Sequence, residues 1–111
     1  EFIAITDELG KDALVEVHTE NEALKELRAG AELVGINNRD LRDFRVDLAT
    51  TKKLAKFFSK KVFLVSESGI QSGKDLIYLR THGARAVLVG ESLMKNPSPG
   101  AALRTLLEAA R

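Results

Sequence analysis

Four apolar segments of the chain each end in polar residues or glycine, which are residue types that bind ligands and transfer protons. The segment ends read VEVH, GINNRD, VSESG and LVGES. Their side chains include the carboxylates of Glu16 and Glu67, the amide of Asn37 and the guanidinium of Arg39. If the apolar bodies are parallel strands, their carboxyl ends meet at one edge of the sheet, where α/β folds bind ligands. The sequence therefore predicts one site at which these groups converge.

Two glycines follow the third and fourth of these segments, Gly69 in SESGI and Gly90 in VGESLM. Glycine lets the backbone approach a ligand closely and turn its N–H groups toward an anion. In β/α barrels the loops after the seventh and eighth strands bind phosphate in this way, sometimes with a short extra helix. Residues 91–95 could form such a helix. The alternative is that both glycines only make tight turns.

The polar candidates each have a structural alternative. Glu16 and Glu67 lie among apolar residues, where a carboxylate must be paired, hydrogen-bonded or protonated, and such surroundings suit proton transfer. The structural alternative for both is an ion pair with a neighbouring Lys or Arg, or an exposed strand end. Asn37 could orient a substrate or cap the loop turn. Arg39 could clamp an anionic group or pair with a nearby aspartate, Asp40 or Asp43.

Helix-forming and strand-forming patterns alternate along the chain. We expect helices at 2–9 (closed by Gly10), 19–30, 47–59, 72–83 and 98–111, strands at 13–18, 32–37, 62–67 and 84–90, and a loop at 38–46. Thr19 and Glu22 have the spacing of a capping box, and Asp47 and Ser72 are expected caps. A helix followed by four strand–helix repeats predicts a parallel sheet with right-handed crossovers.

Composition excludes several classes of protein. The 111 residues, 44% hydrophobic and 30% charged, indicate one folded domain spanning 1–111. A net charge of +1 gives no electrostatic reason to expect nucleic acid or a membrane surface as partner, and the absence of cysteine excludes disulfides. We expect no metal site, because His18 and His82 have no partner at ligand spacing. No signal peptide is visible, so a cytoplasmic location is expected, and the missing initial methionine suggests a processed product or a piece of a longer chain.

The segments LVEVHTENE, GINNRDL, LVSESGI and ARAVLVGESLM resemble the C-terminal half of indole-3-glycerol-phosphate synthase. The resemblance covers nearly the whole chain, from about Asp12 to the end, and GINNRDL together with SESGI is its most specific part. The family fold is an eight-stranded β/α barrel, in which the four strands expected here resemble strands five to eight. The implied fold class is therefore α/β, a parallel (βα)4 half of a TIM (β/α)8 barrel.

The resemblance also implies roles for individual residues. Glu16 matches a fifth-strand glutamate that acts in proton transfer, Asn37 a substrate-contacting asparagine, and Glu67 a glutamate that lines the pocket. Arg39 and Leu88 match substrate-binding positions, the latter in the apolar wall near the aromatic ring. The phosphate-binding positions match Ser68, Gly69, Gly90 and Glu91. Many relatives carry a small hydroxyl residue where this chain has Glu91.

The implied reaction belongs to tryptophan biosynthesis and requires no metal or organic cofactor. A carboxy-lyase converts 1-(2-carboxyphenylamino)-1-deoxyribulose 5-phosphate into indole-3-glycerol phosphate, carbon dioxide and water. The family's principal acid groups are lysines on the first and third strands, which are absent from this chain. A non-catalytic phosphate-binding or assembly module is therefore the alternative. Another phosphosugar barrel is a third reading, which EVH and GINNRD argue against.

Half a barrel leaves the edges of its first and last strands open and an apolar inner face exposed to water. We expect a partner that completes it, either a second copy of the chain or an N-terminal half-barrel.

Overall fold

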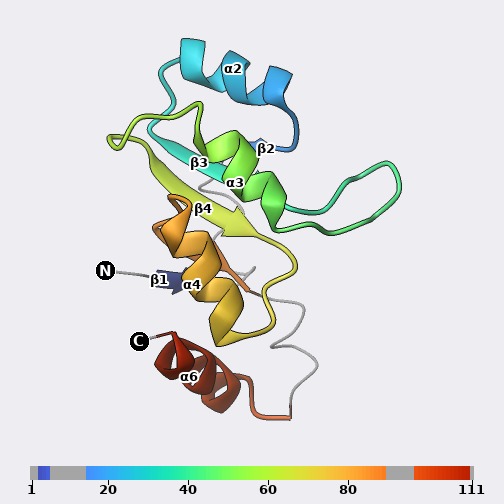
Figure 1. Cartoon of the computed structure of the whole chain (residues 1–111), viewed down its shortest axis with the longest axis vertical. Helices are drawn as coiled ribbons and strands as arrows, with labels where there is room; N and C mark the ends of the chain where they lie inside the picture. Colours follow the sequence, from blue (N-terminus) through green and yellow to red (C-terminus); the bar gives the residue numbers. More distant parts are fainter. Residues whose placement is uncertain (1–2, 6–14, 90–96, 111) are drawn as a thin grey trace.

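Parallel strands form one sheet in the computed structural model of the chain, which describes residues 3–5, 15–89 and 97–110 (Figure 1). The strands are β1 Ile3–Ile5, β2 Val15–Val17, β3 Leu33–Asn37, β4 Phe63–Glu67 and β5 Ala86–Leu88, and the helices are α2 Glu20–Arg28, α3 Ala49–Ala55, α4 Gly73–Thr81 and α6 Pro99–Ala109. The strand order is β1-β5-β4-β3-β2. From β2 onward each strand is followed by a helix, which confirms the four predicted repeats and the half-barrel fold.

The N-terminal segment differs from the prediction. Ile3–Ile5, expected within a helix at 2–9, is strand β1 and pairs in parallel with β5. Isoleucine is a strong strand former, and the pairing satisfies backbone groups at an edge of β5 that would otherwise stay open. Gly10, the expected helix cap, lies outside the described residues. The expectation of an open edge is therefore wrong for β5.

The two faces of the sheet carry different residues in register across the strands. Val17, Ile36, Ser66 and Val87 are paired in one row, and their face packs against the helices. The opposite face carries the apolar cluster of Val65, Ala86 and Leu88, with Leu33 and Phe63 beside it. Side chains alternate between faces along a strand, so this second face is the one that a closed barrel would enclose.

Local sequence fixes where the helices begin. Thr19 and Glu22 form the predicted capping box of α2, and Ser72 with Asp75 forms one at α4. Helix α3 begins after Leu48, whose side chain makes no cap. Asp47, the predicted cap, instead accepts a hydrogen bond from the Ala49 N–H at 2.9 Å.

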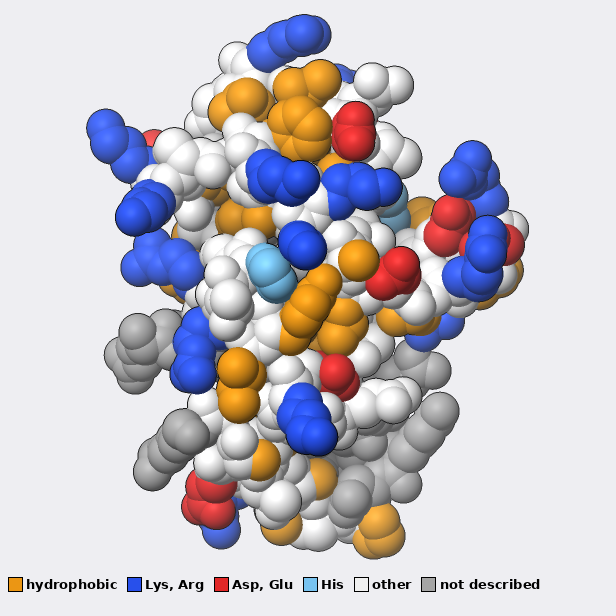
Figure 2. Space-filling view, viewed as in Figure 1, with side chains coloured by type: hydrophobic (Ala, Val, Ile, Leu, Met, Phe, Trp, Pro, Cys, Tyr) orange, Lys and Arg blue, Asp and Glu red, His pale blue; other side chains and the backbone are white. Residues whose placement is uncertain are grey.

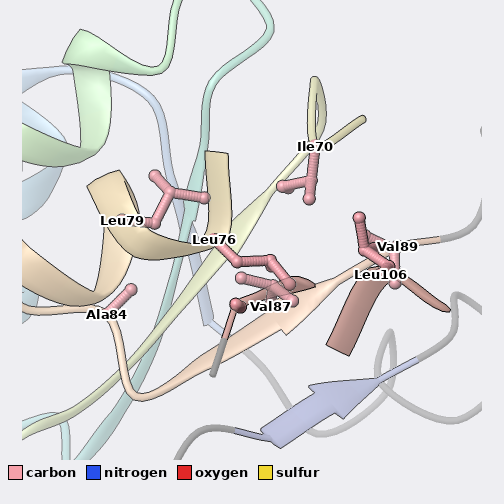
Figure 3. Packing of buried hydrophobic residues seen from close by; sticks show 8 residues of the cluster. Ile70, Leu76, Leu79, Ala84, Val87, Val89 and Leu106 are labelled. Atoms are coloured by element: carbon pink, nitrogen blue, oxygen red, sulfur yellow. The ribbon is translucent and has the colours of Figure 1, made fainter. Parts of the chain in front are cut away.

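Helices α4 and α6 pack closely over β5. Their core contains Leu76, Leu79, Val87 and Leu106, all buried (Figure 3). A Cβ added to Gly73 would lie 2.5 Å from the Cβ of Ala109, so glycine permits the close approach of the two helices. Figure 2 shows Lys and Arg side chains spread over the helix-covered face. No helix in the described ranges has the length and apolar character needed to cross a bilayer.

Candidate active site

Three candidate residues lie in one row at the carboxyl edge of the sheet. Asn37, Glu67 and Leu88 are the last residues of β3, β4 and β5, and the register pairs Asn37 with Glu67 and Glu67 with Leu88. Glu16 is paired with Gly35, two positions before Asn37, and therefore faces the same side. The sheet thus brings the three predicted catalytic residues and the apolar wall residue to one face.

The amide of Asn37 is fixed by two hydrogen bonds. Its Oδ1 accepts from the Arg39 N–H at 3.0 Å and from Ser68 Oγ at 2.8 Å. The first bond caps the turn, which is one of the two roles considered for Asn37. The second bond joins β3 to the loop after β4. Because the oxygen is held by two donors, the NH₂ group is the part of this amide suited to bind a further partner.

The two carboxylates differ in burial. Glu67 is buried, with 3% of its surface exposed, whereas the Glu16 side chain is 36% exposed. Glu16 belongs to β2, the last strand of the sheet, and no described strand lies against its outer edge. The expectation of a buried carboxylate is therefore confirmed for Glu67 but not for Glu16.

His18 lies between two carboxylates. Its Nε2 is 4.0 Å from Glu16 Oε2, and its Nδ1 is 3.5 Å from Glu22 Oε1. Glu22 also accepts hydrogen bonds from the His18 and Thr19 N–H groups through the same oxygen. The helix cap of α2 therefore places an imidazole beside the Glu16 carboxylate.

The loop after β4 has an unusual backbone. Ser68 and Gly69 both have positive φ, 72° and 82°. A Cβ at Gly69 would overlap the side chain of Val46, so the glycine is required by the fold itself. Ile70 anchors the far end of the loop in the core between α4 and β5, where Figure 3 shows it with Leu76 and Val89.

A cleft of about 770 Å³ opens between the start of α2 and the loop 38–46. Asn37, Arg39 and His18 line it, together with Arg42 and Arg45. Glu67 and Leu88 are not among its lining residues. The cleft therefore joins the polar end of the row to a rim that carries three arginines and three acidic residues, Glu22, Asp40 and Asp47.

Two ion pairs order the rim of this cleft. Asp40 pairs with Arg42 at 3.1 Å and Asp43 with Arg45 at 2.7 Å, so the aspartates considered as partners for Arg39 pair with other arginines. The side-chain hydrogen bond from Arg42 lowers the pKa of Asp40. The backbone N–H of Arg45, followed by its side chain, lowers the pKa of Asp43.

The remaining candidates are placed as follows. Gly90, Glu91 and the expected helix at 91–95 lie outside the described residues. Within the described part of the chain, no three His, Cys, Asp or Glu residues are grouped as a metal site would require. A second cleft of about 800 Å³, between α3 and α4, is lined by Lys52, Lys56, Arg80 and Arg85 and holds none of the predicted site residues.

Comparison with known proteins decides the family. The model of the family described as indole-3-glycerol phosphate synthase matches residues 1–106. The chain belongs to this family. An indole-3-glycerol phosphate synthase from Carboxydothermus hydrogenoformans is 49% identical over 96% of this chain and 41% of its own length. One from Caldanaerobacter subterraneus subsp. tengcongensis is 50% identical over 85% of the chain and 37% of its own length.

The chain therefore spans about two fifths of the indole-3-glycerol phosphate synthases that it matches. Solved structures agree on the fold. A thiamine phosphate pyrophosphorylase from Pyrococcus furiosus aligns with a TM-score of 0.69 at 19% identity, covering 96% of this chain and 57% of its own. A mandelate oxidase variant aligns with a TM-score of 0.65 at 22% identity, and the alignment covers 87% of this chain and 34% of the oxidase. At such identities the likeness concerns the fold alone.

Sequence reasoning missed one group behind the site, the buried side chains of Asn38, Thr51 and Ser66. The signal for it was a second asparagine after Asn37 and a serine inside the apolar strand 62–67, both residue types that need hydrogen-bond partners when buried.

Proposed function

We propose that this chain is the substrate-phosphate half of an indole-3-glycerol phosphate synthase. The observation that carries the proposal is the register row of Asn37, Glu67 and Leu88 at the carboxyl edge of the sheet. It puts an amide, a buried carboxylate and an apolar side chain side by side on the face that a barrel would enclose. A ketose that must exchange protons and that carries an aromatic ring needs these three kinds of contact.

Each residue then has a part in converting 1-(2-carboxyphenylamino)-1-deoxyribulose 5-phosphate. Asn37 donates from its amide to the substrate hydroxyl or ketone groups, and Glu67 transfers or stabilises a proton where water is excluded. Glu16, with His18 beside it, is the second carboxylate for the dehydration. Leu88 packs against the aromatic ring, and Arg39 binds an anionic group of the substrate.

The phosphate of the substrate is assigned to the two loops that follow β4 and β5. Ser68 and Gly69 supply the first loop, and Gly90 and Glu91 the second. Backbone N–H groups at positive φ form concave anion sites, and the positive φ of Ser68 and Gly69 supports this assignment for the first loop. No metal or organic cofactor takes part in the proposed reaction.

The proposal requires a second half. The lysines that the resemblance assigns as acids belong to strands absent from this chain, and β2 has an outer edge that no described strand covers. We infer that a missing N-terminal half, or failing that a second copy, completes the barrel in the cytoplasm. The native mass in solution separates these partners, because a second copy predicts a dimer of the isolated chain.

The activity test compares the chain alone with the chain joined to the N-terminal half of a relative. Substrate is supplied and indole fluorescence is followed. We expect turnover only from the joined protein, and Glu67→Gln should reduce its kcat by about 100-fold or more, as loss of a general acid–base group does. Glu108→Gln, a change on α6, is the matched control. Absence of turnover in the joined protein would contradict the proposal.

A non-catalytic phosphate-binding module is the second candidate, because the Ser68–Gly69 loop is formed by contacts within this chain alone. It predicts that the isolated chain binds inorganic phosphate and that Gly90→Leu abolishes the binding. Phosphate binding by the joined protein without any turnover would favour this reading.

A further inference from the structure

A buried hydrogen-bonded cluster lies directly behind the candidate site, on the helix-facing side of the sheet. It consists of Asn38, the residue that follows β3, Thr51 from α3 and Ser66 from β4. Their exposed fractions are 2%, 0% and 0%. Three polar side chains buried this deeply must form hydrogen bonds with one another or with nearby backbone groups. These hydrogen bonds constrain the loop that follows β4.

Asn38 uses its full hydrogen-bonding capacity. Its Oδ1 accepts from Thr51 Oγ1 at 2.7 Å and from the Thr51 N–H at 3.2 Å. Its Nδ2 donates to Ser66 Oγ at 2.9 Å and to the carbonyl oxygen of Ser68 at 3.0 Å. Thr51 Oγ1 and Ser66 Oγ are 2.6 Å apart, which closes the cluster. The amide therefore has one orientation, and one of its N–H bonds is committed to the loop after β4.

The carbonyl that Asn38 holds belongs to the peptide between Ser68 and Gly69. The chain has no cis peptide bond in its described part, and in a trans peptide the C=O and N–H point in opposite directions. Because the Ser68 carbonyl is drawn toward the buried amide, the Gly69 N–H must point away from it, out of the helix-facing side. An anion that accepts a hydrogen bond from the Gly69 N–H would have to approach the loop from that side.

The backbone of Asn38 strengthens this arrangement. Its N–H donates to the carbonyl of Glu67 at 2.8 Å, and its carbonyl accepts from the Asp47 N–H at 3.0 Å. Ser68 needs such support, since a φ of 72° is unfavourable for a residue with a side chain. One residue thus ties together the strand end that carries Glu67, the start of α3 and the strained peptide.

We propose that Asn38 is a positioning residue that orients the Ser68–Gly69 peptide so that the Gly69 N–H donates to the substrate phosphate. The inference rests on the proposed function, because it assigns the loop to phosphate. A positioning role for Asn38 differs from a purely structural role in one measurable respect. Removing the Nδ2 donor must weaken phosphate binding by more than the loss of stability explains.

The test uses the joined full-length protein and the variant Asn38→Asp. Aspartate keeps the shape and the acceptor for Thr51, but places an oxygen against the Ser68 carbonyl and so releases the peptide. Losing a buried hydrogen bond of this kind predicts about a tenfold rise in KM for the phosphorylated substrate, with a smaller change in kcat. The inhibition constant of inorganic phosphate should rise by about the same factor.

Thr51→Val is the matched control. It removes the hydroxyl from the cluster but leaves the Asn38 Nδ2 bond to Ser68, so it should lower the melting temperature without raising either constant. Ser68→Gly provides the rescue, because glycine adopts a positive φ without strain. In that background, Asn38→Asp should have a smaller effect on the phosphate inhibition constant than it has beside Ser68.

Equal effects of Asn38→Asp and Thr51→Val on the phosphate constant, at a temperature where both are folded, would overturn the inference. If Asn38→Asp does not fold, Asn38→Ser makes the same comparison, since its side chain cannot reach both Thr51 and Ser68. If the parent protein shows no turnover, the proposed function fails separately. The dissociation constant of inorganic phosphate, measured by calorimetry, still decides the role of Asn38.

Discussion

Asn37 and Ser68 are joined by a 2.8 Å hydrogen bond from the serine Oγ to the amide Oδ1. The bond connects the candidate substrate-binding amide at the end of β3 with the loop after β4, and the two residues are 31 positions apart in the chain. The bond therefore orients the Asn37 amide and the loop after β4 together, and we expect a change in one to alter the orientation of the other.

Replacing Ser68 by alanine tests this coupling. Ser68→Ala removes the donor and leaves Asn37 Oδ1 with the Arg39 N–H, so the loss in unfolding free energy should be about 1 kcal/mol. Because the amide is then held by one hydrogen bond instead of two, KM for the substrate should rise by a few-fold in the joined protein. Steady-state kinetics and urea unfolding measure the two effects. A KM that does not change would show that Asn37 is held by Arg39 alone.

Gly69 should be intolerant of a side chain for two separable reasons. Gly69→Ala places an alanine at a φ of 82° and against Val46, and the cost in unfolding free energy should be about 2–4 kcal/mol. Gly30→Ala is the matched control, because Gly30 has a similar φ of 76° with no atom within 4 Å of an added Cβ. The Gly30 variant has the backbone strain without the overlap. The difference between the two losses of unfolding free energy, measured in urea, is therefore the cost of the overlap with Val46. Equal losses would exclude that overlap.

The loop 38–46 should lose order in acid. The pKa values of Asp40 and Asp43 are lowered in the folded chain by hydrogen bonds from Arg42 and Arg45. A lowered folded-state pKa stabilises the loop fully above the ordinary aspartate value of about 3.9, and this contribution is lost as the pH falls below it. Protection of the Phe44 amide, which donates to the Asp40 carbonyl, should therefore hold from pH 7 to pH 5 and fall below pH 4.

Two further measurements test whether the two ion pairs cause this acid effect. Asp43→Asn should remove part of the pH dependence, and added salt should weaken the pairs, since both are exposed at the surface. Protection of the Phe44 amide that is unchanged at pH 3 would contradict the assignment.

The pairing of β1 with β5 predicts a specific response to proline. Ala4→Pro removes a backbone donor from β1, whereas Ala4→Val keeps the donor and favours a strand. Hydrogen exchange of the β5 amides at 86–88 should speed up in the proline variant and not in the valine variant. Equal exchange in both would show that β1 contributes nothing to the stability of β5.

Much of this molecule was predictable from local sequence. Thr19 with Glu22 and Ser72 with Asp75 fix the starts of α2 and α4, because a side-chain oxygen three residues from an N–H donor can form the cap without help from the rest of the fold. The apolar runs ending in polar residues predicted the strands and a common carboxyl edge that holds Asn37 and Glu67, whereas Leu88 was named only by the family resemblance.

Only the tertiary structure decided the rest. Ile3–Ile5 is a strand because the edge of β5 offers its backbone partners, and no local pattern records that edge. Glu67 is buried and Glu16 exposed because one strand is central and the other terminal, although the two lie among similar apolar residues in the sequence. The position of Asn38 behind the site follows from the folded arrangement, which brings Thr51 and Ser68 to its amide. Hydrogen bonds between distant segments depend on how those segments lie in space.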